Sequence, residues 1–271
     1  MSDEENMELM GIAEHEADAD GQLILDKEVV YPEPIGEEEL QEIIEIEENS
    51  RSLPEPPRAD VNLEVPFVHQ LWDTPDWYNG HWGCGPTSAT MVLAYYGLLQ
   101  AKPMMVSWPF RHESEYGWYL GNDFSANGRK FNISAKTPDG WAKGFYGTAV
   151  ANVTNIGWCA VAQMGRRGMV PLMNTFLTTI NKRVRSIQPS ERVAKATIDK
   201  GNPVIVSGRP FTLNGHLMVI RGYYYDRRRR ATAWIMNDPY GYRSTGHRQY
   251  DGGNIVYWWD EIEPKYMYVI A

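Results

Sequence analysis

Cysteine is scarce in this chain, since Cys84 and Cys159 are the only two among 271 residues. Two cysteines cannot build a multi-bridge disulfide framework or a cysteine-rich zinc site. No run of about 18 apolar residues exists, so no membrane span is predicted. The first residues, Met-Ser-Asp-Glu-Glu-Asn, are acidic where a signal peptide would be basic and then apolar. We therefore expect synthesis in the cytoplasm and leave the final location open, with a virion or the extracellular space among the options.

Basic residues are almost absent from the first 60 positions, which hold 20 Asp/Glu and only 3 Lys/Arg. The net charge of this part is −17, whereas residues 61–271 have a net charge of +8. This division predicts an acidic N-terminal arm joined to a mildly basic domain. Low hydrophobicity with high charge argues against an independent core in the arm, so residues 1–60 are expected to be largely disordered.

One part of the arm, residues 36–50, has apolar side chains at helical spacing, with Leu40, Ile43 and Ile44 on one face. Two interpretations are open. The arm is either a solvated tail throughout, or it contains a short helix that docks on the basic domain. In the second case the arm would mask the cleft of its own domain, as an inhibitory segment does.

The remaining residues, 61–271, are rich enough in apolar and aromatic side chains to form one domain with a substantial core. Residues 101–148 set many aromatic residues among Gly and Asn, without regular periodicity. They are interpreted as an irregular insertion folded onto the domain, either as ordinary loop packing or as a wall of the substrate site. Elsewhere the patterns predict helices at 149–164 (with Cys159 as a buried structural residue), 171–184 and 190–200, an extended run at 61–68, and strands at 203–207, 217–225, 232–236, 255–259 and 266–270.

Four consecutive arginines, Arg227 to Arg230, follow Asp226 between two of these strands. A basic hairpin tip is usually a solvated turn, and one cluster of four residues is a weak signal for phosphate binding. No nucleic-acid partner is therefore predicted.

The most distinctive stretch is residues 80–97, GHWGCGPTSATMVLAYYG. Cys84 lies between two glycines, Pro86 suits the first turn of a helix, and Gly97 can end that helix in a left-handed C-cap. A cysteine at a helix N-terminus meets unpaired N–H groups and the positive end of the dipole, which favour the thiolate. Cys84 is either a small buried residue in a glycine-rich turn or a nucleophile, and the combination of features favours the nucleophile.

A cysteine nucleophile needs a base and a group that orients the base. Of the six histidines, His216 begins a buried strand, and Asp238 follows the strand that returns about 20 residues later. Strands joined by a hairpin are neighbours, so Asp238 can meet the imidazole of His216 at one end of the sheet. Asp238 could also simply start an Asx-type turn before Pro239. Of the others, His15 lies in the acidic arm, and no obvious fixing partner is evident for His69, His81, His112 and His247.

Several motifs together resemble the papain-like cysteine peptidases, and within them the bacteriocin-processing (double-glycine) peptidase group. They are Gln70, WGCGPTS at 82–88, GNPVIV at 201–206, GHLMVI at 215–220 and NDPYG at 237–241, in the order Gln, Cys, His, Asp. The resemblance covers about residues 62–271. It implies an α+β fold in which a helical part with the cysteine packs on an antiparallel sheet with the histidine and aspartate.

The same resemblance implies Cys84 as nucleophile, His216 as base, Asp238 as its orienting group and Gln70 in the oxyanion hole. The Gln70–Cys84 spacing is longer than the family pattern, and the insertion and the arm have no counterpart there. The expected activity is hydrolysis of a peptide or related amide bond through a thioester, with no cofactor or metal.

Three alternatives stay open at this stage. The protein could be a cell-wall (peptidoglycan) hydrolase or virion-associated factor, or a papain-like binding or structural protein without catalysis. A zinc hydrolase using His69, His81 and Cys84 is the least favoured, because no second compact ligand pair accompanies them.

Overall fold

The structure is a computed structural model, and it describes residues 60–78, 80–81, 83–127, 129–131, 135–137, 140–142, 169–208 and 216–271. Residues 1–59 of the acidic arm, which include the predicted helix at 36–50, lie outside these residues. So does the predicted helix at 149–164 with Cys159. Within the described residues, no helix combines the length and the apolar character needed to cross a membrane.

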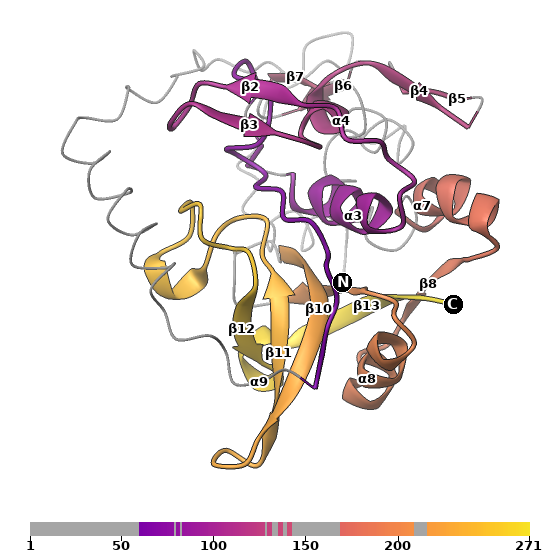
Figure 1. The fold of residues 1–271 in the computed structure, drawn as a ribbon, viewed down its shortest axis with the longest axis vertical. Coiled ribbons are helices and arrows are strands. Elements are labelled where there is room, and N and C mark those ends of the chain that lie inside the picture. The colour runs from indigo at the N-terminus through magenta and orange to yellow at the C-terminus, as the bar shows by residue number, and fades with distance from the viewer. Residues whose placement is uncertain are drawn as a thin grey trace, which may run out of the picture.

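A seven-stranded antiparallel sheet forms the centre of the described part of the chain (Figure 1). Its spatial order is β12-β11-β10-β9-β13-β8, and β1 pairs with one half of β10. The strands of this sheet are β1 (Val61–Asn62), β8 (Val184–Ile187), β9 (Val204–Gly208), β10 (His216–Asp226), β11 (Ala231–Asn237), β12 (Ile255–Trp258) and β13 (Pro264–Ile270). The described helices are α3 (Cys84–Tyr95), α4 (Trp118–Gly121), α7 (Met169–Leu177), α8 (Glu191–Asp199) and α9 (Trp259–Ile262), with 3-10 turns at Thr178–Ile180 and Arg243–Thr245. The fold is therefore α+β, as predicted.

The five predicted strands are all present, each within two residues of its expected bounds. In the extended run at 61–68, only Val61–Asn62 pairs as a strand. The predicted helix at 190–200 is confirmed as α8, with the Ser190 hydroxyl accepting the Val193 N–H at 3.3 Å as its N-cap. Short-range patterns were sufficient at these places because each element has a strong apolar or capping signal of its own.

Each face of the sheet is covered by its own apolar core. Successive strand residues point to opposite faces. Along β10, Leu217 and Val219 join the core beneath α3 and α7, while Met218 and Ile220 join the core beneath α8 and α9. This double burial explains why β9 and β10 are almost continuously apolar in sequence.

Helix α3 begins at Cys84 and is buried from Gly85 to Ala94. Its end is the predicted left-handed cap, because Gly97 has φ +67° and donates its N–H to the Ala94 carbonyl at 2.8 Å. The Leu98 N–H then reaches the Leu93 carbonyl at 3.0 Å, which completes a Schellman-type ending. The cysteine is thus presented by a helix that the core fixes on nearly all sides.

The predicted helix at 171–184 is wrong in its second half, where a 3-10 turn (Thr178–Ile180) and a short loop lead into β8 at Val184. Helix α7 ends at Leu177, and Asn181 is left-handed with φ +61°. The Asn174 side chain then bonds both backbone groups of Val184, accepting its N–H at 2.8 Å and donating to its carbonyl at 3.2 Å. This clamp turns the chain back into the sheet, and a local apolar pattern does not predict it.

The segment predicted as irregular contains three short antiparallel pairs, which are β2 (Met104–Val106) with β3 (His112–Ser114), β4 (Phe124–Ala126) with β5 (Arg129–Phe131), and β6 (Ala135–Thr137) with β7 (Gly140–Ala142). Strands of three residues are too short to give a readable alternation. Phe131 is buried in the core beneath α3 and stacks on Phe124, with ring centroids 4.5 Å apart. Part of the aromatic content of this segment is therefore core, and a role of the rest as a substrate wall stays a prediction.

Candidate active site

Cys84 is the first residue of α3 and remains partly exposed, with a free thiol. The first N–H groups of a helix have no intrahelical acceptors, so the sulfur lies beside unpaired donors. The helix is tied to the sheet next to it, because the Ser88 hydroxyl donates to the Leu217 carbonyl at 3.1 Å. Leu217 directly follows His216, and this bond therefore fixes the cysteine helix relative to that histidine.

His216 and Asp238 meet at one end of the sheet, as the hairpin argument predicts. Val219 of β10 pairs with Asn237 of β11. His216 and Asp238 both lie beyond this pair at the same end of the two strands, so they come together. His216 Nε2 lies 2.5 Å from Asp238 Oδ1, and the two residues are 3% and 0% exposed. The contact at Nε2 leaves the opposite ring nitrogen, Nδ1, for the thiol.

His216 is held as an imidazolium by its surroundings. Burial alone would lower its pKa, but the Asp238 carboxylate and the hydrogen-bonded Cys84 sulfur outweigh that effect and raise the pKa from 6.5 to about 10. At neutral pH the ring therefore carries a proton. This places a proton donor beside the Cys84 sulfur.

Asp238 makes both of the contacts considered from the sequence, one to His216 and one that starts a turn. Its Oδ1 accepts the Tyr240 N–H at 2.9 Å, which is an Asx-type turn, and the same oxygen accepts His216. Its Oδ2 accepts the Tyr257 hydroxyl at 3.1 Å. The carboxylate is therefore fixed from three elements, and desolvation with the nearby Asp238 charge raises the pKa of Tyr257 so that its hydroxyl keeps the proton.

Gln70 lies behind the turn that leads into Cys84 and is 1% exposed. Its Nε2 donates to the carbonyls of Gly80 and His81, both at 2.9 Å, and its backbone N–H donates to Pro239 at 2.7 Å. Both amide hydrogens are thus engaged with backbone carbonyls rather than directed at a substrate oxygen. The side chain orients the turn at Gly80 and His81, and the backbone N–H links Gln70 to the Asp238 loop.

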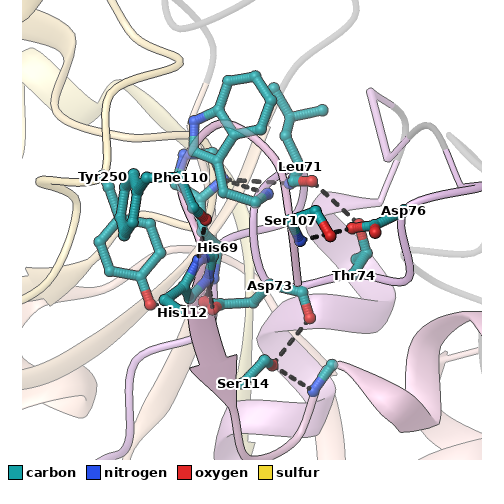
Figure 2. A network of polar contacts seen from close by, with 12 residues as sticks. His69, Leu71, Asp73, Thr74, Asp76, Ser107, Phe110, His112, Ser114 and Tyr250 are labelled. Atoms are coloured by element: carbon teal, nitrogen blue, oxygen red, sulfur yellow. Dashed lines mark hydrogen bonds and ion pairs between the residues drawn. The ribbon is translucent and has the colours of Figure 1, made fainter. Parts of the chain in front are cut away.

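His69 has fixing partners that the sequence does not reveal (Figure 2). Its Nδ1 accepts the N–H groups of Leu71 and Trp72, at 3.1 and 3.2 Å, so Nε2 carries the hydrogen and donates to the Gln249 carbonyl at 3.1 Å. The ring stacks between Trp72 and Tyr250. Complete burial lowers its pKa to about 3, so it stays neutral. With both nitrogens engaged, His69 has no lone pair for a metal.

His112 is held by a buried carboxylate, as Figure 2 shows. Its two ring nitrogens lie 2.9 Å from the Phe110 carbonyl and 3.1 Å from Asp73 Oδ1, so both act as donors. Burial opposes the charge, but these bonds outweigh it and raise the pKa of His112. Asp73 also accepts the Tyr250 hydroxyl at 2.9 Å and the His69 backbone N–H at 2.6 Å. This cluster fastens the β2–β3 hairpin to the segment that contains Gln70.

His81 and His247 flank the His216–Asp238 pair and likewise have neighbours. His81 Nδ1 lies 3.1 Å from the Tyr240 hydroxyl, and burial followed by the charge of Arg248 lowers the pKa of His81. His247 Nε2 lies 3.8 Å from Asp238 Oδ2, and burial is the main cause that lowers the pKa of His247. Neither histidine shows an obvious fixing partner in the sequence, and both have a neighbour in the loop that follows β11, Tyr240 for His81 and Asp238 for His247.

No group of three or more His, Cys, Asp or Glu side chains suited to a metal ion is present among the residues that the structure describes. The zinc set considered from sequence would need His69, whose two nitrogens are already bonded. The chemistry that the arrangement can perform is that of a buried imidazolium–carboxylate pair beside a free thiol.

A protein-family model matches residues 62–267, and its description is the Peptidase_C39 like family. This match spans well over half of the chain and contains Gln70, Cys84, His216 and Asp238. The chain belongs to the C39-like peptidase family. The resemblance drawn from the sequence motifs is thereby confirmed, and the family is one of cysteine peptidases.

Two solved structures are similar to this C39-like protein. One is described as a C39-like peptidase from Bacillus anthracis, at 19% identity and a TM-score of 0.36, covering 77% of this chain and 96% of that one. The other is UfSP from C. elegans, at 12% identity and a TM-score of 0.37, covering 82% of this chain and 36% of that one. Among the curated proteins, none matches.

The residues around the site that sequence analysis missed are Tyr240, Tyr257, His247 and Arg248. Tyr257 lies on β12 and reaches Asp238 only because β12 pairs with β11. Tyr240 and Arg248 meet across a loop in which Gly241 has φ +89°. The NDPYG motif of the C39-like protein contains Tyr240, which was the one local signal available.

Proposed function

We propose that this protein is a cysteine peptidase that hydrolyses a peptide or related amide bond, with Cys84 as nucleophile, His216 as acid and base, and Asp238 as the group that orients His216. The observation that carries the proposal is the buried His216–Asp238 contact of 2.5 Å beside the free thiol. A nucleophile, a base and an orienting carboxylate in this relation are the parts that acyl transfer requires.

In the proposed reaction, the Cys84 thiolate attacks the substrate carbonyl carbon, and the electron pair of the carbonyl moves to oxygen. His216 gives its proton to the leaving nitrogen as the C–N bond breaks, which releases the amine and leaves a thioester on Cys84. The neutral His216 then takes a proton from water as the water attacks the thioester. Collapse of this intermediate releases the acid and restores the thiolate–imidazolium pair. No cofactor takes part in these steps.

The oxyanion is proposed to be held by the backbone N–H of Cys84, one of the donors in the first turn of α3 without an intrahelical acceptor. Gln70 remains the second proposed donor. For this role one of its two N–H bonds, to the Gly80 or the His81 carbonyl, would pass to the substrate oxygen. Its position directly behind the turn that leads into Cys84 supports this assignment.

The proposed substrates are peptides, or the peptide parts of peptidoglycan, because both present the amide bond on which this mechanism acts. The test is hydrolysis of a fluorescence-quenched peptide library, with isolated cell walls as a second substrate. We expect Cys84→Ala to lower turnover by at least about 10⁴-fold, since the nucleophile itself is removed.

The matched control is Cys159→Ala, which removes the other cysteine and should keep turnover. Circular dichroism and the unfolding midpoint should show both variants folded. Hydrolysis retained by folded Cys84→Ala protein would refute the proposal.

A further inference from the structure

Arg248 lies at the edge of the proposed site, and one residue, Tyr240, connects it to both the His216 side and the Cys84 side. Arg248 Nε donates to the Tyr240 hydroxyl at 2.9 Å. The Tyr240 ring lies 6.1 Å from the ring of His216 and 6.1 Å from that of His81, which precedes Cys84 by three residues. Tyr240 therefore bridges Arg248 to the base on one side and to the cysteine turn on the other.

The backbone at Arg248 is held in an uncommon conformation. Both His247 and Arg248 are left-handed, with φ +64° and +63°. Two hydrogen bonds of 2.6 Å maintain this arrangement, from the Arg248 N–H to the Tyr240 carbonyl and from Trp72 Nε1 to the Arg248 carbonyl. A left-handed conformation of a non-glycine residue costs energy and is frequent at ligand sites, where the surroundings maintain it.

The guanidinium group of Arg248 has donors to spare. Only its Nε is engaged, and the side chain is exposed, so the terminal N–H groups have no partner among the residues that the structure describes. Two carboxylates close to Arg248 in sequence, Asp238 and Asp251, are bonded elsewhere. Asp238 binds His216 and Tyr257, and Asp251 accepts Thr245 and the Tyr242 N–H.

We propose that Arg248 is a specificity residue that binds a carboxylate of the substrate close to the scissile bond, with Tyr240 holding the guanidinium in place. This inference rests on the proposed peptidase function and adds the substrate class, which is peptides that present an acidic group. Arginine suits this task because its planar fork can give a carboxylate two parallel hydrogen bonds. The carboxylate comes from an Asp or Glu side chain or from a free C-terminus.

The experiment compares matched peptides in fluorescence-quenched libraries. In one set a single position at a time is Glu or Gln, and in the other the same peptide ends in a free acid or an amide. For the wild-type protein we expect one placement of the carboxylate to raise kcat/KM about tenfold or more over its neutral partner, as a charge-assisted hydrogen bond would. The placement identifies the source of the carboxylate.

Two variants locate the effect. Arg248→Gln should lower this acid-to-neutral ratio about tenfold, and Arg248→Lys should give an intermediate ratio because it keeps the charge and loses the fork. Arg227→Gln is the matched control, because it removes the same charge from the exposed β10–β11 turn at the other end of β10. It should leave the ratio unchanged.

A binding assay separates this inference from the proposed function. Cys84→Ala protein, with and without Arg248→Gln, is titrated with the Glu and Gln peptides. Preference for the acidic peptide that depends on Arg248 supports the inference even if no peptide is hydrolysed. A ratio that Arg248→Gln leaves unchanged, in cleavage or in binding, overturns it. An equal response to the acidic and the neutral peptide at every position of the Glu/Gln set and in the acid/amide set overturns it as well.

Discussion

Two buried histidines in this protein have opposite charge states, and their partners explain the difference. The His69 ring is enclosed by aromatic rings and its nitrogens bond only neutral backbone groups, so burial prevails and its pKa falls to about 3. His216 is buried just as deeply, but it faces the Asp238 carboxylate and the Cys84 sulfur, and its pKa rises to about 10. The neutral ring serves as structure, and the charged ring is suited to chemistry.

His69 should make the fold sensitive to acid. Its pKa is lower in the folded than in the unfolded protein, so the unfolded chain binds more protons as the pH falls below about 6.5. The free energy of unfolding is therefore about 2 kcal/mol lower at pH 5 than at pH 7. We expect the free energy of unfolding of His69→Gln, measured by urea unfolding, to fall about 2 kcal/mol less between pH 7 and pH 5 than that of the wild type.

The control for this prediction is His15→Gln, which changes a histidine of the acidic arm and should leave the pH dependence as in the wild type. Parallel pH curves for His69→Gln and the wild type would contradict the assignment of a neutral, buried His69.

At the scale of elements, the site is assembled from a turn, a helix and a hairpin. Gln70 lies behind the turn before α3, and a Cβ on Gly80 would lie only 1.7 Å from the Gln70 carbonyl oxygen. Only glycine allows the turn to approach this closely. The arrangement aligns Cys84 with His216, which the Ser88 bond to Leu217 fixes from the other side.

We expect Gly80→Ala to displace the turn and lower turnover at least about tenfold, with a loss of about 1–3 kcal/mol in stability from the overpacking. Gly97→Ala is the matched control. It places a side chain at φ +67° with nothing within 4 Å, so it should cost about 1 kcal/mol of stability and keep turnover. Equal effects of the two variants on turnover would contradict the role of the turn.

Local patterns were enough to predict α3, the strands around His216 and Asp238, and the meeting of those two residues. A hairpin relation is short-range in sequence, so its geometry can be predicted without the fold. Tyr257 and Arg248 could not be predicted, because they reach the site through strand pairing and a loop crossing. The engagement of the Gln70 amide with Gly80 and His81 is likewise a tertiary contact, invisible in the motif.

At the scale of the whole molecule, the acidic arm and the basic domain meet at β1. Val61 pairs with Tyr223, seven residues along β10 from His216, a span of about 24 Å. Residues 36–50 precede Val61 by at least eleven residues, and that length of extended chain can cover about 36 Å. The arm is thus attached away from the site and is long enough to reach it.

Removal of residues 1–57 should raise the rate of peptide hydrolysis severalfold, because we propose that the arm masks the site. Residues 1–60 have a net charge of −17 and residues 61–271 a net charge of +8, so the arm is attracted to the domain. The difference should shrink as salt screens the attraction. Removal of residues 1–35 alone keeps the predicted helix at 36–50 and is expected to release less activity. Equal rates for the 1–271 and the 58–271 proteins would refute the masking.

The central claim, that Cys84 is activated by His216, is tested most directly by the rate of iodoacetamide alkylation at each cysteine, followed by peptide mass spectrometry at pH 6 to 7. We predict that Cys84 reacts at least about tenfold faster than Cys159, and that His216→Ala removes this advantage. Asp238→Asn should reduce it in part, since the ring loses its charged partner. Equal alkylation rates for Cys84 and Cys159 in the wild-type protein would contradict the account.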